Sequence, residues 1–103
     1  MIYFINEVGS QYIKIGFSLK FPTTRLLELS TGNPRKLQLL AYEEGNLKKE
    51  KELHKRFKKF HVNLEWYDGV SEDLVNYINN ISTDYIKYDK ETKAIQIYKK
   101  MKQ

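Results

Sequence analysis

Two short segments near the start of the chain alternate hydrophobic and polar residues as β-strands do. Residues 2–5 read I-Y-F-I, and residues 12–18 read Y-I-K-I-G-F-S. The polar segment N-E-V-G-S-Q between them is typical of the turn of a β-hairpin. Because side chains alternate across a strand, Tyr3 and Lys14 are expected on one face of this hairpin and Ile13 on the other.

Three later segments have the features of helices. Pro22 suits the first turn of a helix that is expected to end at Gly32. The lysine-rich segment 46–60 gathers its apolar residues in one sector when each residue is turned by about 100°. Ser71 precedes two acidic residues and is typical of the N-cap of a last helix that runs to about Ile81.

The order of these elements predicts the fold class. A third strand is expected over residues 37–42, whereas residues 61–70 are expected to be irregular. The resulting order β-β-α-β-α-α predicts an α+β domain with a three-stranded antiparallel sheet flanked by helices. Residues 1–82 are expected to form this domain. Residues 83–103 are expected to form a C-terminal extension that either trails from the domain or packs on it, with the alternation of a β-hairpin.

The composition is that of a single basic domain. The 103 residues include 18 Lys and Arg against 13 Asp and Glu, which gives a formal net charge of +5. This balance favours an anionic partner, most simply nucleic acid. The chain has no cysteine, which excludes disulfides, thiolate nucleophiles and cysteine-bound zinc. Since there is no basic leader and no apolar stretch of about 20 residues, we expect a soluble intracellular protein that binds no membrane.

One acidic residue stands out inside the segment 46–60. Glu50 lies near the centre of its apolar stripe, which consists of Leu47, Leu53, Phe57 and Phe60. A carboxylate that faces inward loses hydration, so it needs a metal, a cation or hydrogen-bond donors. Glu50 is therefore a candidate ligand for Mg²⁺ or Mn²⁺, and the alternative is a structural ion pair with Arg25 or a lysine. His54 follows one helical turn later and is expected to face the same pocket.

Five short motifs occur in order along roughly the first 80 residues. They are Ile2-Tyr3, Lys14-Ile15-Gly16, R-L-L-E-L-S-T-G-N-P from Arg25, E-K-E-L-H-K-R-F from Glu50, and Glu65-Trp66-Tyr67. In their order and separations they resemble the GIY-YIG nuclease superfamily, and most of all its small phage- and fungal-type branch, whose second motif reads K-I-G. Met1 departs from the first glycine of that family, and Lys14 departs from its second tyrosine.

The resemblance implies that the protein is an endonuclease that hydrolyses phosphodiester bonds, with DNA as the expected substrate and one Mg²⁺ or Mn²⁺ ion. It implies that Glu50 binds the metal and that Arg25 grips the phosphate through its guanidinium. Tyr3 would act as a general base or position water. Lys14 would provide a positive field for Tyr3 or contact phosphate, and His54 would relay a proton, position water or hydrogen-bond the phosphate.

The spacing of Glu65-Trp66-Tyr67 does not assign it a catalytic role. Trp66 is expected to anchor the core. For Glu65 three alternatives stay open: it caps a loop, it orients Lys14 or Arg25, or it lies near the metal.

Further basic residues are candidates for contacts with a phosphate backbone. Lys49 and Arg56 join Lys14 and Arg25 as predicted nucleic-acid-binding residues, and the alternative for the lysine-rich flanks is a solvated helix face. Two other functions also stay open. One is a catalytically inactive nucleic-acid-binding module of the same fold, and the other is a small interaction protein. A one-metal site cuts one strand per event, so cleavage of both strands would require a homodimer or repeated binding.

Overall fold

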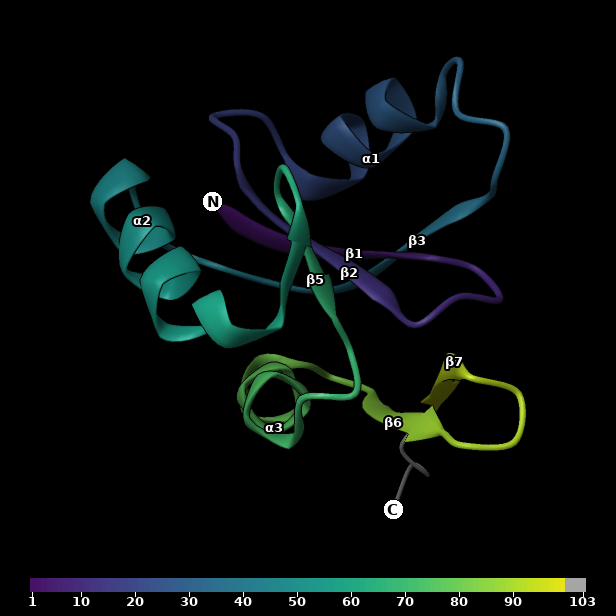
Figure 1. Cartoon of the computed structure of the whole chain (residues 1–103). Helices are drawn as coiled ribbons and strands as arrows, with labels where there is room; N and C mark the ends of the chain where they lie inside the picture. Colours follow the sequence, from purple (N-terminus) through teal and green to yellow (C-terminus); the bar gives the residue numbers. More distant parts are fainter. Residues whose placement is uncertain (100–103) are drawn as a thin grey trace.

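The computed structural model describes residues 1–99, which form one sheet, three α-helices and a C-terminal hairpin (Figure 1). The elements are β1 (Ile2–Glu7), β2 (Tyr12–Phe17), α1 (Pro22–Ser30), β3 (Leu37–Glu43), α2 (Leu47–Arg56), the 3-10 helix η1 (Lys58–Phe60), β4 (His61–Asn63), β5 (Trp66–Asp68), α3 (Glu72–Ile81), β6 (Tyr85–Asp89) and β7 (Ala94–Tyr98). The five strands of the sheet are antiparallel and lie in the order β3-β1-β2-β5-β4. The fold is therefore α+β, with a larger sheet than the sequence predicts.

The prediction of a three-stranded sheet is wrong, because residues 61–70 contain two strands instead of an irregular segment. β4 and β5 have three residues each, which is too short for a recognisable alternation of polar and apolar residues. The turn between them places Leu64 at φ 49°, in the left-handed region. Leucine is not a residue typical of this conformation, so the sequence gives no sign of a turn there. β5 pairs with β2, so that Tyr67 lies opposite Ile13 and Trp66 opposite Lys14.

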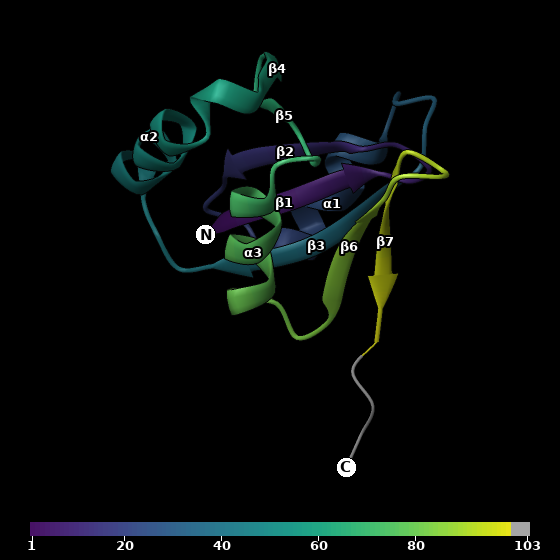
Figure 2. The same ribbon diagram turned by 60° about the horizontal axis from the view of Figure 1, so that its bottom comes forward.

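The sheet buries side chains on both faces. The larger cluster contains, from β1 and β2, the residues Ile2, Phe4, Ile13 and Ile15, which pack with side chains of α2, α3 and the hairpin. On the opposite face, Tyr3 and Ile5 form a smaller cluster that includes Leu37 and is covered by α1. Figure 2 shows α3 in front of the sheet and α1 behind it. The predicted division of the first hairpin into two faces is confirmed.

The helix termini follow from local sequence. Pro22 lies in the first turn of α1, where its missing N–H is not needed. The side chain of Asn46 accepts a hydrogen bond from the N–H of Lys49 at the start of α2, and Ser71 caps α3 in the same way. All three α-helices have ten residues or fewer. Within residues 1–99, none is long and apolar enough to cross a membrane.

The predicted helix 46–60 is interrupted. α2 ends at Arg56, and the chain then tightens into η1. Leu53 and Phe57 are buried in the larger cluster, as the apolar stripe predicts. Leu47, however, is 57% exposed, because the first turn of α2 extends beyond the sheet.

The C-terminal hairpin shares the core of the sheet. Ile86 of β6 and Ile95 of β7 are both buried in the larger cluster. The N–H of Ile95 also donates a hydrogen bond of 2.9 Å to the carbonyl of Ser10. Residues 83–99 therefore pack against the sheet as a hairpin, and residues 100–103 of the predicted extension lie outside the described residues.

Ile95→Ala is expected to lower the free energy of unfolding by about 2–5 kcal/mol, because it leaves a cavity in the core. Leu19 is 94% exposed, so the similar truncation Leu19→Ala is expected to change stability by less than about 0.5 kcal/mol. Urea unfolding followed by circular dichroism measures both. Equally small effects would show that the hairpin does not contribute to the common core.

Candidate active site

The candidate site forms at the edge of β2, beyond Lys14, where the pairing with β5 stops. β5 pairs with β2 from Tyr12 to Lys14, and the backbone of Ile15 and Phe17 continues past it. Because buried N–H and C=O groups need hydrogen-bond partners, other parts of the chain must complete this edge. The first partner is the carbonyl of Glu65, which accepts a hydrogen bond of 3.0 Å from the N–H of Ile15.

Two side chains of α2 complete the rest of the edge. Nε2 of His54 lies 3.0 Å from the carbonyl oxygen of Ile15. Since a carbonyl can only accept, His54 donates from Nε2, and the neutral ring keeps Nδ1 as an acceptor. The carboxylate of Glu50 lies close enough to the N–H of Phe17 for that N–H to lower its pKa. Glu50 and His54 therefore face the same side of α2, as their spacing predicts.

Tyr3 reaches this edge from β1. It lies opposite Gly16 on β2, and its ring is 1% exposed. A Cβ atom at Gly16 would lie only 2.3 Å from Cζ and Oη of Tyr3. The tyrosine ring thus occupies the space that any larger residue at position 16 would need, which explains the glycine of the K-I-G motif.

Arg25 approaches Tyr3 from α1. Its guanidinium lies close enough to the hydroxyl of Tyr3 to lower the pKa of that hydroxyl, and its Nη1 lies 3.3 Å from the carboxylate of Glu28. Its Nε is buried and has no hydrogen-bond partner within residues 1–99. A buried donor without a partner costs free energy, which makes Arg25 a residue whose role needs an explanation beyond packing.

Lys14 lies between an acid and an aromatic ring. Its Nζ is 3.6 Å from Oε2 of Glu65 and 5.5 Å from the centre of the Trp66 ring. Of the three alternatives for Glu65, the structure favours the one in which it orients Lys14. The side chain of Glu65 also lies close enough to Glu50 for its negative charge to raise the pKa of Glu50. Trp66 packs against the smaller cluster, in keeping with the expected core anchor.

The carboxyl group of Glu50 is harder to ionise than that of an ordinary glutamate. Burial is the main cause of its raised pKa, and the negative charge of Glu65 adds to it. His54, the Phe17 N–H and Lys14 act in the opposite direction without cancelling these effects. A bound cation would favour the ionised carboxylate, so the environment of Glu50 suits a metal ligand.

Tyr3 is also harder to ionise than usual. Burial raises its pKa most, whereas the guanidinium of Arg25 lowers it and the charge of Glu65 raises it again. The hydroxyl is therefore protonated at neutral pH. Of the two roles predicted for Tyr3, this protonation state favours the positioning of water or phosphate over general-base catalysis.

The donor set determines which metal would fit. Within residues 1–99 there is no group of three or more His, Cys, Asp or Glu side chains that could hold a metal ion. This set does not fit zinc, which takes three or four protein ligands. It fits Mg²⁺, which keeps several waters and is held by one or two carboxylates together with substrate phosphates.

Five of the predicted site residues converge at this edge, namely Tyr3, Lys14, Arg25, Glu50 and His54. The other two are held by acidic partners. Nζ of Lys49 lies 2.7 Å from Glu43, and Arg56 makes hydrogen bonds of 2.8 and 3.2 Å with Asp73. The predicted contacts of Lys49 and Arg56 with phosphate therefore remain predictions that compete with these ion pairs.

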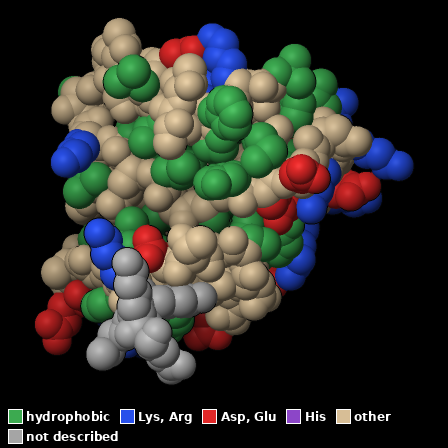
Figure 3. Space-filling view, turned by 180° about the vertical axis from the view of Figure 1, so that it is seen from behind, with side chains coloured by type: hydrophobic (Ala, Val, Ile, Leu, Met, Phe, Trp, Pro, Cys, Tyr) green, Lys and Arg blue, Asp and Glu red, His purple; other side chains and the backbone are tan. Residues whose placement is uncertain are grey.

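The distribution of basic side chains on the surface is uneven. On the face seen in Figure 3, hydrophobic side chains gather in the upper half, and Lys and Arg lie mainly at the margin. Two of the exposed apolar residues of the chain, Leu27 and Tyr42, come from α1 and β3. The face drawn there is thus not the one expected to follow a phosphate backbone.

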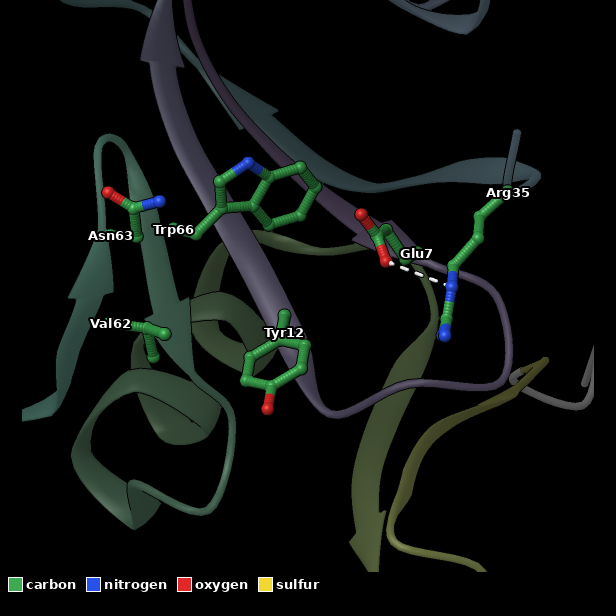
Figure 4. Close-up of a pocket in the computed structure, with 6 residues that line it drawn as sticks. All are labelled: Glu7, Tyr12, Arg35, Val62, Asn63 and Trp66. Carbon is green, nitrogen blue, oxygen red and sulfur yellow. Dashed lines mark ion pairs between the residues drawn. The ribbon is translucent and has the colours of Figure 1, made fainter. Parts of the chain in front are cut away.

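A pocket of about 310 Å³ lies beside Trp66 and was missed by sequence reasoning (Figure 4). It is lined by Glu7, Tyr12, Arg35, Val62, Asn63 and Trp66. These residues come from β1, β2, the α1–β3 loop, β4 and β5, and two of these strands were not predicted. The one available signal was alternation along β2, which places Tyr12 on the same face as Lys14.

Gly16→Ala is expected to lower the free energy of unfolding by about 1–3 kcal/mol, because the new methyl group would overlap the Tyr3 ring. In a Tyr3→Leu background, which lacks the overlapping ring atoms, the same substitution is expected to cost much less. A double-mutant cycle measured by urea unfolding tests this coupling. The same cost in both backgrounds would contradict the close approach of Tyr3 to Gly16.

The raised pKa of Glu50 predicts a pH-dependent stability difference between the wild type and Glu50→Gln. The ordinary glutamate value is 4.5, and the folded value lies above it. Glu50 therefore contributes most to the free energy of unfolding below pH 4.5, and this contribution is lost as the pH rises through the folded pKa. Glutamine does not titrate, so its contribution stays constant. Relative to wild type, Glu50→Gln should gain stability in urea unfolding as the pH rises above the ordinary value of 4.5. The exposed control Glu52→Gln should show a nearly constant difference, and a constant difference for Glu50→Gln would contradict the burial of this acid.

Comparison with known families gives one match. The T5orf172 domain matches residues 1–82, which contain the whole sheet and the three α-helices. No curated protein and no solved structure matches the chain. The match corrects the family indicated by the five motifs, since the family found is the T5orf172 domain and not the GIY-YIG nuclease superfamily. Because the match spans most of its length, the chain belongs to the T5orf172 domain family, a nuclease-like, DNA-binding family compatible with a nucleic-acid-related role.

Proposed function

We propose that this protein is a divalent-metal-dependent endonuclease that hydrolyses phosphodiester bonds, with DNA as its expected substrate. The observation that carries the proposal is the convergence of Tyr3, Arg25 and Glu50 at the free edge of β2. These side chains come from β1, α1 and α2, and both Arg25 and Glu50 influence the pKa of Tyr3. Such a cluster of perturbed titratable groups is typical of an active site.

The metal site would be centred on Glu50, with Glu65 beside it. A bound Mg²⁺ or Mn²⁺ ion would supply charge neutralisation at the phosphoryl oxygens and assist the leaving oxygen. An ionised carboxylate has several lone pairs, so Glu50 can bind a metal ion while it lies beside the N–H of Phe17.

The phosphate would be held by Arg25 and Tyr3. The buried Nε of Arg25 provides a donor that lacks a partner within residues 1–99, and phosphate oxygens are suitable acceptors for a guanidinium. The protonated hydroxyl of Tyr3 donates a hydrogen bond to a phosphoryl oxygen or to the attacking water. Lys14 adds a positive charge on the same face of the sheet.

The proton of the attacking water would go to His54. Its Nε2–H is committed to the carbonyl of Ile15, and this bond fixes the ring orientation. Nδ1 of the neutral ring is then the nitrogen that accepts a proton. This assignment gives the base role to His54, and it leaves Tyr3 protonated.

The test is cleavage of supercoiled plasmid and of single-stranded circular DNA in the presence of Mg²⁺ or Mn²⁺. Glu50→Gln and Arg25→Ala are expected to lower the cleavage rate by about 10²- to 10³-fold, as loss of one transition-state contact does. The exposed controls Glu52→Gln and Lys87→Ala remove one negative and one positive charge, as the two site substitutions do, and should keep the wild-type rate. Cleavage that survives both site substitutions would contradict the proposal.

A readout without turnover separates the metal site from catalysis. Mn²⁺ should raise the unfolding midpoint of the wild type by binding the folded state, and Glu50→Gln should reduce this increase. DNA binding without cleavage by the wild type would instead indicate the inactive binding module. An equal effect of Mn²⁺ on both proteins would place the metal elsewhere.

A further inference from the structure

The pocket beside Trp66 and the candidate active site lie on one continuous face of β2. Trp66 lines the pocket, and Nζ of Lys14 lies 5.5 Å from the centre of its ring. Along β2, Gly16, Lys14 and Tyr12 follow one another at every second position, so neighbouring members of this row are separated by roughly 7 Å. The pocket therefore lies within reach of the nucleotides that flank a phosphate held at Glu50.

The lining of the pocket combines aromatic and polar groups. Figure 4 shows the rings of Trp66 and Tyr12 on two sides of it, Val62 and Asn63 along one wall, and Glu7 and Arg35 on the opposite wall. Tyr12 is 38% exposed, so its ring is accessible to a ligand. Nε of Arg35 lies 3.8 Å from Glu7, which is a loose surface ion pair that a ligand can replace.

This set of groups matches the chemistry of a nucleobase. Aromatic side chains stack on the π-face of any base, and an amide such as that of Asn63 both donates to and accepts from a base edge. The guanidinium of Arg35 can bind the adjacent phosphate. At about 310 Å³, the pocket is at the small end of ligand sites and accommodates one planar group better than a duplex.

We propose that this pocket binds one unpaired nucleobase of the strand whose phosphate is held at Glu50. A base that is stacked inside a duplex cannot enter a pocket of this kind without leaving the helix. The substrate class is therefore a nucleic acid that is single-stranded or locally unpaired next to the scissile bond. The identity of the neighbouring phosphate rests on the proposed nuclease function, whereas binding of the base requires no turnover.

Trp66 is the only tryptophan of the chain, so its fluorescence reports directly on the pocket. The full chain is titrated in EDTA with a short oligothymidylate, with its RNA counterpart, with a duplex of equal length and with an oligonucleotide of abasic sugars. The single strand that carries bases is expected to quench Trp66, and the duplex and the abasic strand are not. A stronger response to the DNA or the RNA strand supports the pocket and identifies its sugar preference.

Tyr12→Ala is expected to weaken single-strand binding by about 5- to 150-fold, the range for loss of one stacking partner. Tyr12→Phe keeps the ring and should bind as the wild type does. The hydrogen bonds of Tyr12 with Asn6 and Ser10 run through its backbone, so both variants are expected to fold, which circular dichroism verifies.

The outcomes distinguish this inference from the proposed function. Equal quenching by base-bearing and abasic strands, or unchanged single-strand affinity in Tyr12→Ala, overturns the base pocket. Glu50-dependent cleavage without base-dependent quenching also overturns the pocket and leaves the nuclease intact. Base-dependent quenching that Tyr12→Ala weakens, in a protein that cleaves nothing, supports the pocket and removes the nuclease.

Discussion

The site depends on one structural constraint: β5 is shorter than the strand with which it pairs. Beyond Lys14, the backbone of β2 continues without that partner and still needs hydrogen bonds. The carbonyl of Glu65 and the side chain of His54 provide two of them, and the carboxylate of Glu50 lies close to the N–H of Phe17. The requirement that completes the sheet is thus the same one that turns an acid and a histidine of α2 toward Tyr3. The cost of this arrangement is visible in the raised pKa of Glu50, which burial makes harder to ionise.

A second constraint fixes the opposite wall of the site. Gly16 has no side chain, so the ring of Tyr3 lies directly against β2, and Arg25 then reaches the tyrosine hydroxyl from α1. A short strand and a missing side chain together bring five elements to one point. Neither feature contributes a reactive group, but together they determine where the polar side chains of the site lie. Substitutions at Gly16 therefore act on the site through packing, whereas substitutions at Glu50 act on it through charge.

The sequence predicts those parts of this arrangement that depend on local pattern. The two faces of the first hairpin and the convergence of Glu50 and His54 follow from the periodicity of strands and helices. The strands on either side of Leu64 could not be predicted, because three residues are too few to show an alternation of polar and apolar side chains. Since these strands line the pocket beside Trp66, the pocket was missed as well. The family was also misassigned. In the short motif Lys14-Ile15-Gly16, the glycine is required because the ring of Tyr3 packs against it. Such a packing requirement can occur in unrelated families, so the motif does not identify one family.

The charges of the site also explain why a metal ion and a phosphate would bind together in the proposed function. Lys14 is paired with Glu65 and Arg25 with Glu28, so each cation that would hold phosphate is already balanced by an acid. A phosphate that draws Lys14 away leaves Glu65 without its partner, next to an acid whose pKa Glu65 already raises. A metal ion alone faces the positive charges of Lys14 and Arg25. When a cation and an anion arrive together, Glu50 and Glu65 would meet the metal while Lys14 and Arg25 meet the phosphate, so each new charge finds a group of the opposite sign.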